Sequence, residues 1–214
     1  MAGSMPRLFI LGAGGHGAVV ADIALRAGLN PSGFVDAFKA GGRLLDLPIH
    51  ASLEGLDAEA LVLALGDNYK RQQLLESLRD QGSFLFPTLI HPSAVVAGSV
   101  TIGPGSMIMA GAIIGPNTRV GEFCIVNHRA SLDHDSRLAD FASLAPGAIT
   151  GGGVEIGQRS AVSLAAAVKH GVKIGRDTVL GANSYLNKDL GDELIAYGSP
   201  AKQIRSRSPG EPYL

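Results

Sequence analysis

Aliphatic residues recur at every sixth position between Val96 and about Asn187, and this repeat dominates the chain. The first positions of the hexads are Val96, Ile102, Ile108, Ile114, Val120, Val126, Leu132, Leu138, Leu144, Thr150, Ile156, Val162, Val168, Ile174 and Leu180. Thr150 alone interrupts this column, and every fifth position, such as Ser106 or Ala112, is small. An amphipathic helix needs a spacing of 3.6 and a half-buried strand a spacing of 2. A period of six instead indicates a hexapeptide β-helix, in which short strands alternate with corners.

The residues before the repeat predict a strand, a glycine-rich loop, a helix and a second strand. The apolar run 7–11 precedes Gly12-Ala-Gly-Gly-His-Gly17, residues 18–27 have helical spacing that Gly28 ends, and residues 33–36 form the next strand. The glycines at 12, 14 and 17 and Asp36 have the spacing of a dinucleotide fingerprint. Bare backbone N–H groups at a helix start attract any phosphate, so a nucleotide diphosphate fits this loop. A full dinucleotide fold needs two such halves, and one half predicts a single nucleotide.

A further strand and helix complete this front part. Residues 60–65 read as a strand, Gly66-Asp-Asn-Tyr-Lys-Arg71 follows as a loop, 72–79 has helical spacing, and 84–90 is expected as a last strand. We therefore predict a Rossmann-like half domain over 5–90, a β-helix domain over 91–205 and a polar tail over 206–214 with frayed ends.

Composition narrows the class of protein. The 18 Lys+Arg and 19 Asp+Glu give a net charge of −1, so no nucleic-acid surface is expected. Cys124 is the one cysteine and falls in the small inward column, which predicts a packing role and excludes a disulfide framework. The first apolar run is too short to span a membrane, and we expect a cytoplasmic protein with no membrane partner.

Several motifs together resemble one family. They are the loop 12–17, Gly66-Asp-Asn68, His91-Pro-Ser-Ala94, the hexads and Gly198-Ser-Pro-Ala-Lys202. This combination is similar to the nucleotide-sugar acetyltransferases with hexapeptide repeats, which include PglD-like, perosamine and sialic-acid acetyltransferases of glycan biosynthesis. The resemblance implies a left-handed parallel β-helix of three hexads per coil, in which residues eighteen apart stack. It also implies a homotrimer, with acetyl-CoA as cosubstrate between subunits and a sugar nucleotide on the front domain.

The resemblance assigns the catalytic residues. The family's histidine segment matches Asn127-His-Arg-Ala-Ser-Leu-Asp-His134-Asp135. His134 would then be the general base, since an imidazole with an ordinary pKa of about 6.5 can take a proton near neutral pH. Asp135, or as the second choice Asp133, would orient the imidazole, and Asn127 would hydrogen-bond near the reacting centre. The alternative from the residues alone is an exposed polar corner.

The stacking rule adds Gly152, one coil after His134 and next to the break at Thr150. Its N–H, about 4.8 Å away, would hold the acetyl carbonyl oxygen, and glycines that merely ease a corner are the alternative. By resemblance, Leu164 and Ala182 line the pantetheine path. The expected sugar-nucleotide contacts are Gly14, Gly15, His16, Asp36, Asp67 and Asn68.

One departure leaves alternatives open. PglD-like members carry a second histidine after an Asp-Phe pair, where this chain has Ser143. We expect an acetyl-CoA-dependent N-acetyltransferase for a UDP- or GDP-linked amino-dideoxy sugar, without a metal. O-acetylation of a hydroxyl, as on sialic acid, and a non-catalytic nucleotide-binding trimer are the alternatives. A carbonic-anhydrase-like β-helix would need three converging histidine ligands, and His128, His134 and His170 do not obviously converge.

Overall fold

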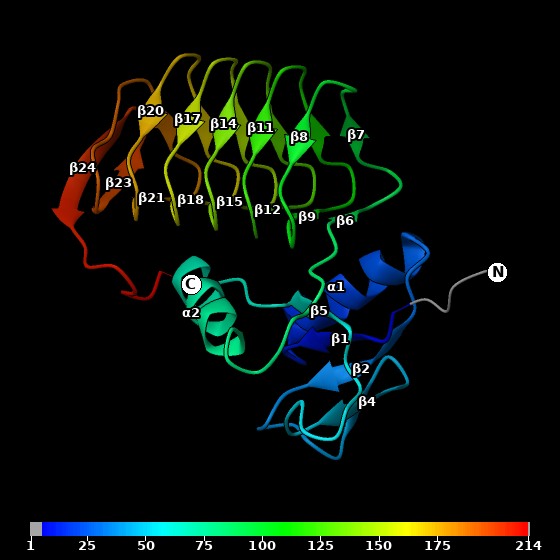
Figure 1. Ribbon diagram of the computed structural model, residues 1–214. Helices are drawn as coiled ribbons and strands as arrows, with labels where there is room; N and C mark the ends of the chain where they lie inside the picture. The colour runs from blue at the N-terminus through cyan, green and yellow to red at the C-terminus, as the bar shows by residue number, and fades with distance from the viewer. Residues whose placement is uncertain (1–5, 214) are drawn as a thin grey trace.

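The computed structural model describes residues 6–213 and consists of a front α/β unit and a parallel β-helix that lies over it (Figure 1). The front unit contains β1 (Leu8–Leu11), α1 (Gly15–Arg26), β2 (Pro31–Val35), β3 (Arg43–Leu44), β4 (Leu47–His50), β5 (Ala60–Leu63) and α2 (Asn68–Leu78). The predicted order of strand, glycine loop, helix and strand is confirmed. Helix α2 begins at Asn68 instead of Gln72, because Asp67 Oδ1 accepts a hydrogen bond from Lys70 N and caps the first turn.

The sheet of the front unit has the order β3-β4-β2-β1-β5, and every pair except β3–β4 is parallel. All residues of β1 and of the edge strand β5 are buried, as expected for parallel strands covered on both faces. The carboxyl ends of β1 and β5 therefore lie side by side. This arrangement brings the loop 12–17 next to the loop 64–67.

The β-helix is built from two-residue strands followed by a longer hairpin. Its strands are β6 (Leu89–Ile90), β7 (Val95–Val96), β8 (Thr101–Ile102), β9 (Met107–Ile108), β10 (Ile113–Ile114), β11 (Arg119–Val120), β12 (Ile125–Val126), β13 (Ser131–Leu132), β14 (Arg137–Leu138), β15 (Ser143–Leu144), β16 (Ile149–Thr150), β17 (Glu155–Ile156), β18 (Ala161–Val162), β19 (Ala167–Val168), β20 (Lys173–Ile174), β21 (Val179–Leu180), β22 (Tyr185–Leu186), β23 (Leu194–Gly198) and β24 (Ala201–Ser206). Three parallel sheets result, in the orders β22-β19-β16-β13-β10-β7, β20-β17-β14-β11-β8 and β24-β23-β21-β18-β15-β12-β9-β6, with β23–β24 the antiparallel pair.

The predicted period of eighteen residues per coil is confirmed by the strand pairing. Ile113 pairs with Ser131, and Arg119 pairs with Arg137. From Gly105 to Asn183, the fourth residue of each hexad adopts a positive φ between 51° and 70°. The repeat therefore combines two extended residues with a left-handed corner, a conformation in which glycine and asparagine are the least strained.

The interior follows the two predicted columns. The aliphatic first-position residues from Ile108 to Leu180 are buried, and so is Thr150. The small fifth-position residues let the walls approach closely. Their hydroxyls also bond between coils: Ser106 Oγ accepts from Cys124 N at 2.9 Å, and Ser160 Oγ accepts from Thr178 N at 2.8 Å.

The three outer faces of the β-helix differ in chemistry. On the β12 face, Met107 and Ile125 are buried in a core that they share with the front unit. The β11 face carries exposed charged residues such as Arg137 and Glu155. The β13 face exposes large apolar side chains, which are Val95, Ile113, Ile149 and Tyr185. The β13 face is thus an apolar surface that nothing in residues 6–213 covers.

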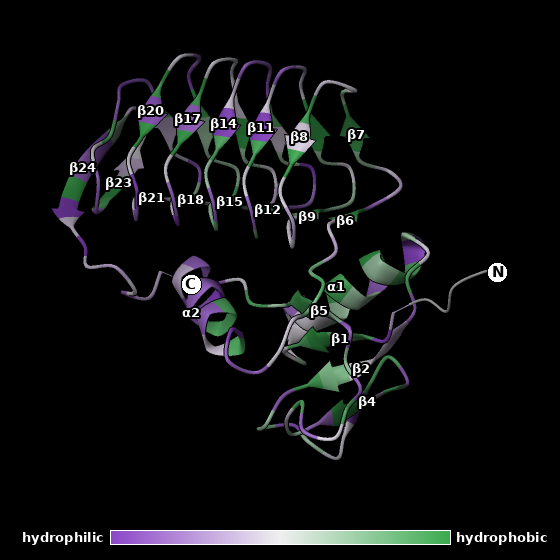
Figure 2. Cartoon of the chain, in the orientation of Figure 1, coloured by the Kyte–Doolittle hydropathy of each residue, from purple (hydrophilic) through white to green (hydrophobic). Residues whose placement is uncertain are grey.

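Helix α2 joins the two units through both apolar and polar contacts: its Leu78 shares a core cluster with Phe123 and Phe141 of the β-helix. In Figure 2 most of the α2 ribbon has the colour of hydrophilic residues, with apolar residues among them. Arg71 is fully buried and donates to the carbonyl oxygens of Phe123 and Phe141 at β-helix corners, and to that of Leu65 in the loop after β5. These bonds fix the loop 64–67 against the β-helix.

Two expectations about the chain's boundaries were wrong. Residues 84–90 do not form a strand of the front sheet: Leu85 makes only an isolated bridge to Ala60, and Leu89–Ile90 pairs with β9. The tail is not frayed within the described residues, because Arg207 is buried and the Tyr213 hydroxyl accepts a hydrogen bond from Asn68 N at 3.1 Å. Among the described residues, no helix is long and apolar enough to cross a membrane.

Candidate active site

His134 and Asp135 form a hydrogen-bonded pair at the corner that follows β13. His134 Nδ1 lies 2.7 Å from Asp135 Oδ2, and Asp135 Oδ1 accepts from Asn117 Nδ2 at 3.1 Å. The positive φ of Asp135, 56°, turns its carboxylate back toward the imidazole. Because Nδ1 is engaged with the carboxylate, Nε2 is left as the nitrogen that can accept a proton from a ligand.

The carboxylates raise the proton affinity of this imidazole. The hydrogen bond to Asp135 raises the pKa of His134, and the negative charge of Asp133 raises it further. The same bond lowers the pKa of Asp135. Asp133 has a second contact, since its Oδ1 accepts from His134 N at 2.7 Å. Asp135 is therefore the ring's partner, and Asp133 supports the backbone.

Gly152 lies one coil on, directly against the imidazole. A Cβ atom on Gly152 would fall 2.4 Å from both His134 Nε2 and Cε1, so only glycine leaves the ring in this position. Gly153 N donates to His134 O at 2.8 Å, whereas Gly152 N makes no hydrogen bond within residues 6–213. The structure thus brings an unused N–H next to the candidate base, as the stacking rule predicted.

Thr150, the break in the aliphatic column, belongs to this corner. Its Oγ1 accepts a hydrogen bond from Asp133 N at 3.1 Å, while its side chain stays buried. In the coils on either side, the equivalent amides of Gly115 and Gly151 donate to the backbone carbonyl oxygens of Leu132 and Val168 at 2.9 Å, so at Thr150 a side-chain acceptor takes the place of a backbone acceptor. The irregularity in the repeat therefore supports the segment that carries His134.

A groove of about 670 Å³ lies on another side of the β-helix, between the β12 face, the front unit and the tail. Its wall includes His16, Asn127, Leu164 and Ala182. These four residues were predicted for three different tasks, and the structure brings them together. Ser143 and Tyr213 also line this groove.

His16 contributes an unusual group to the groove. Burial, helped by the positive charge of Arg71, lowers the pKa of His16 to about 4, so the ring is neutral at physiological pH. Its Nε2 is buried and has no hydrogen-bond partner within residues 6–213. An unpaired buried nitrogen is costly unless a ligand or water satisfies it.

The glycine loop around His16 is open where a ligand would approach. A Cβ on Gly14 or Gly15 would meet no atom within 4 Å, whereas one on Gly17 would fall 2.2 Å from Gly12 O. Gly17 is therefore needed for packing of the loop. Gly14 and Gly15 instead leave backbone N–H groups accessible at the start of α1.

The other predicted substrate residues have contacts inside the chain. Asp36 Oδ2 accepts from Ala13 N at 3.0 Å and so holds the glycine loop. Asp67 caps α2. Asn68 is buried, its Nδ2 donates to Ser143 Oγ and Ser160 O, and its Oδ1 accepts from Arg71 Nη2. Asp67 and Asn68 thus hold the groove in shape.

His134 and the groove occupy different corners of one chain. Asn127, Leu164 and Ala182 lie at the corners between the β12 and β13 faces, and His134 and Gly152 lie at the corners that follow the β13 face. The uncovered apolar face separates the two sets. A single chain therefore does not bring the candidate base to the groove that holds Asn127.

Two other kinds of reactive group were considered, a cysteine nucleophile and a cluster of metal ligands. Burial raises the pKa of Cys124 to about 12, so its thiol stays protonated. The described residues include no group of three or more His, Cys, Asp and Glu that could hold a metal ion.

Comparison with known proteins finds relatives that span nearly the whole chain. Residues 7–78 match the family model of the PglD N-terminal domain. The chain is 35% identical to a histidine-to-asparagine variant of perosamine N-acetyltransferase from Caulobacter crescentus, solved with CoA and GDP-perosamine, with a TM-score of 0.89 and coverage of 95% of this chain and 99% of that one. It is 33% identical to the acetyltransferase domain of PglB from Neisseria gonorrhoeae in complex with acetyl coenzyme A, with a TM-score of 0.87 and coverage of 93% and 99%.

A curated relative gives the same picture. UDP-N-acetylbacillosamine N-acetyltransferase of Bacillus subtilis (strain 168) is 39% identical over 114 residues, which are 50% of this chain and 52% of that protein. The fold and these relatives thus define a hexapeptide-repeat acyltransferase. More narrowly, the chain belongs to the family of PglD-like nucleotide-sugar acetyltransferases, and the resemblance in the sequence is confirmed. As a member it is an acetyltransferase whose cosubstrate is acetyl-CoA.

Proposed function

We propose that the protein transfers the acetyl group of acetyl-CoA directly to the amine of a nucleotide-linked amino-dideoxy sugar. The observation that carries this proposal is the corner at which His134, held by Asp135, lies against the unused N–H of Gly152. A base and an oxyanion donor on adjacent coils are the two groups that acyl transfer requires. Two of the relatives, perosamine N-acetyltransferase and UDP-N-acetylbacillosamine N-acetyltransferase, are named as N-acetyltransferases, which supports an amine as the acceptor.

In this mechanism the acceptor nitrogen attacks the thioester carbon while His134 Nε2 takes its proton. The carbonyl oxygen becomes an oxyanion that accepts a hydrogen bond from Gly152 N. Collapse of the intermediate breaks the carbon–sulfur bond, and the CoA thiolate takes the proton from the imidazolium. Asp135 stabilises the imidazolium between these steps. The buried, protonated thiol of Cys124 is unsuited to form an acyl-enzyme.

The nucleotide sugar is proposed to bind at the carboxyl ends of β1 and β5. The open N–H groups of Gly14 and Gly15 face its phosphates, and the unpaired Nε2 of His16 gains a partner from it. Asp36, which also holds the glycine loop through Ala13 N, contacts the ribose or the base. Asp67 and Asn68 keep their positions after β5 and maintain the shape of the site.

The site is completed by association of three chains. Self-association through the exposed β13 face would remove its apolar side chains from water. It would also bring the His134 corner of one subunit toward the groove of its neighbour. Leu164 and Ala182 then line the pantetheine arm of acetyl-CoA, and Asn127 lies near the reacting centre. We place the reaction in the cytoplasm, within glycan biosynthesis.

A CoA-release assay with acetyl-CoA tests this function. The acceptors are UDP- and GDP-linked 4-amino-4,6-dideoxy sugars and free sialic acid, and mass spectrometry of the product locates the acetyl group. Turnover with N-acetylation of one amino sugar is expected. Activity on sialic acid alone would move the acceptor to oxygen, and binding of acetyl-CoA without turnover on any acceptor would contradict the proposal.

A further inference from the structure

The C-terminal segment Arg207–Tyr213, here called the strap, returns from β24 to the junction of the two units. Its first residue, Arg207, is 6% exposed and anchors it: Arg207 N donates to Glu193 O at 2.9 Å, and Arg207 Nη1 donates to Asp177 O at 2.8 Å. The guanidinium also lies 5.4 Å from the centre of the Tyr213 ring, within the range of a cation–π contact. One buried cation therefore holds both ends of the strap.

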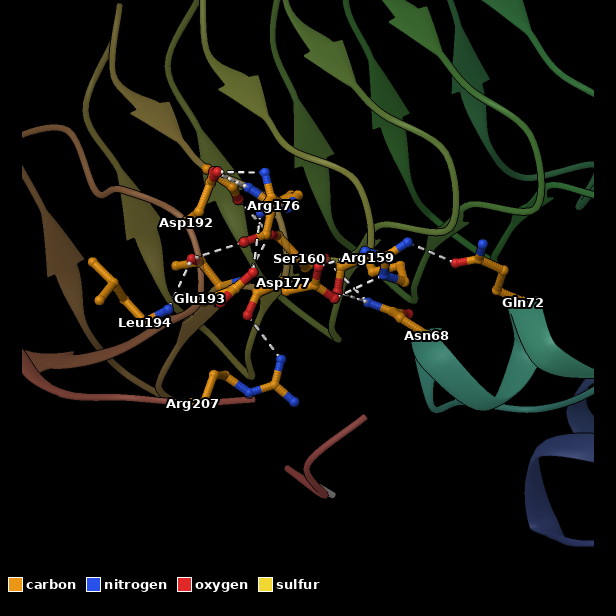
Figure 3. A network of polar contacts seen from close by, with 12 residues as sticks. Asn68, Gln72, Arg159, Ser160, Arg176, Asp177, Asp192, Glu193, Leu194 and Arg207 are labelled. Atoms are coloured by element: carbon orange, nitrogen blue, oxygen red, sulfur yellow. Dashed lines mark hydrogen bonds and ion pairs between the residues drawn. The ribbon is translucent and has the colours of Figure 1, made fainter. Parts of the chain in front are cut away.

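The anchor point is itself fixed to helix α2. Asp177 is 1% exposed and is bound by Arg159 through two hydrogen bonds, from Nε at 2.7 Å and from Nη2 at 2.5 Å. Arg159 Nη1 continues to Gln72 Oε1 at 2.8 Å. Figure 3 shows this chain of contacts from α2 across the β-helix corner to Arg207. The strap, the corner and α2 are thus one connected polar network.

The far end of the strap enters the groove. Tyr213 and Pro212 line it together with His16, Gly66 and Ser143. The Tyr213 hydroxyl accepts from Asn68 N at 3.1 Å, Asn68 Nδ2 in turn donates to the Ser143 hydroxyl at 3.0 Å, and burial raises the pKa of Tyr213.

We infer that Tyr213 is a substrate-selecting residue, which closes the end of the groove nearest the glycine loop and contacts the acceptor nucleotide sugar. This inference rests on the proposed function for the identity of that acceptor. Tyr213 is bonded to the residue that begins α2, directly after the loop 64–67, so it lies at the nucleotide edge of the front sheet. The Tyr213 ring forms one wall of the groove, and it narrows the space for the sugar and excludes water from that space.

Kinetics of strap variants test the inference. Deletion of residues 207–214 and Tyr213→Ala are expected to raise KM for the nucleotide sugar about tenfold and to leave KM for acetyl-CoA and kcat nearly unchanged, as expected for loss of a binding contact. Tyr213→Phe keeps the wall and is expected to recover most of the loss. Ser208→Ala is the matched control, because its side chain is exposed in the same segment. An unchanged KM for the sugar, or a rise in KM for acetyl-CoA alone, would overturn the inference.

A binding measurement separates this inference from the proposed function. The chain contains no tryptophan, so Tyr213→Trp places a single indole in the groove. Its emission is expected to change on addition of UDP or GDP and to stay constant on addition of CoA alone. A response to nucleotide in a protein that acetylates none of the amino sugars would defeat the proposed function and retain the inference. Turnover with no response to nucleotide would defeat the inference alone.

Discussion

The imidazole of His134 rests on Gly152: a Cβ atom at position 152 would lie 2.4 Å from Nε2. The two residues belong to successive coils, and the β-helix register holds them in contact. The proposed base and the proposed oxyanion donor are therefore next to each other on adjacent coils. Changing either residue should affect catalysis more than folding.

Gly152→Ala is expected to lower kcat about 100-fold, because the methyl group must displace the imidazole and a displacement of about 1 Å can cost that factor. Gly98→Ala is the matched control. Gly98 occupies the same column in an earlier coil, and a Cβ there would meet nothing within 4 Å. The kcat of both variants is measured with acetyl-CoA saturating. Equal rates for the two variants would contradict the contact's role.

Asp135→Asn is expected to shift the acid limb of the kcat/KM profile to lower pH. His134 must be neutral to act as a base, and in the wild type the hydrogen bond to Asp135 raises its pKa above the ordinary value of about 6.5. Removing that carboxylate lowers the pKa, so the neutral form appears at lower pH. The plateau rate should fall as well, since the ring loses its orientation.

Asp133→Asn serves as the comparison for that pH profile. The charge of Asp133 also raises the pKa of His134, although less than the bond to Asp135 does. We therefore expect a smaller shift in the same direction. If the acid limb of the kcat/KM profile stays at the same pH in both variants, a group other than His134 controls that limb.

Arg71→Met is expected to lower the free energy of unfolding by about 3 kcal/mol, because buried carbonyl oxygens would lose their donors. Wild-type Arg71 is fully buried and keeps its charge at neutral pH, although burial lowers its pKa to about 10. Arg119→Met on the exposed β11 face is the control and should change stability by less than about 0.5 kcal/mol. Urea unfolding at one fixed protein concentration measures both. An Arg71→Met variant as stable as the control would show that the junction does not depend on this cation.

Ile149→Asp is expected to dissociate the proposed trimer, because it puts a charge in the middle of the apolar β13 face. Thr101→Asp, on the charged β11 face, should leave the assembly intact. Light scattering after size-exclusion chromatography gives the mass of each species. A monomeric wild type, or an Ile149→Asp variant that stays trimeric with full activity, would contradict a site shared between subunits.

The repeat made most of the β-helix predictable. Its period fixes which residues point inward and which stack, so the neighbourhood of His134 and Gly152 followed from counting along the chain. Thr150 was visible as an irregularity, but its reason was not: the hydrogen bond from Asp133 N depends on the actual corner geometry. Periodicity identifies positions in a lattice and does not reveal the polar contacts that each position makes.

The junction and the strap could not be predicted in the same way. Asn68 contacts Ser143, which is 75 residues away, and Tyr213, which is 145 residues away. Such contacts leave no local pattern in the sequence. The tail looked frayed because it is short, polar and rich in turn-forming residues, yet one buried arginine and one tyrosine are enough to anchor it. Residues 84–90 were predicted as a strand because they are apolar and bounded by turn residues. The same pattern occurs in a segment that links two units, and local sequence does not separate the two cases.

The most direct test of the account compares wild-type protein with His134→Ala in the CoA-release assay, on the nucleotide amino sugar that the wild type acetylates best. The variant is expected to keep its trimeric mass and its affinity for acetyl-CoA and to lose at least about 100-fold in kcat, the usual contribution of a general base. Wild-type turnover by an intact trimer of the His134→Ala variant would contradict the central claim that this imidazole takes the proton from the acceptor.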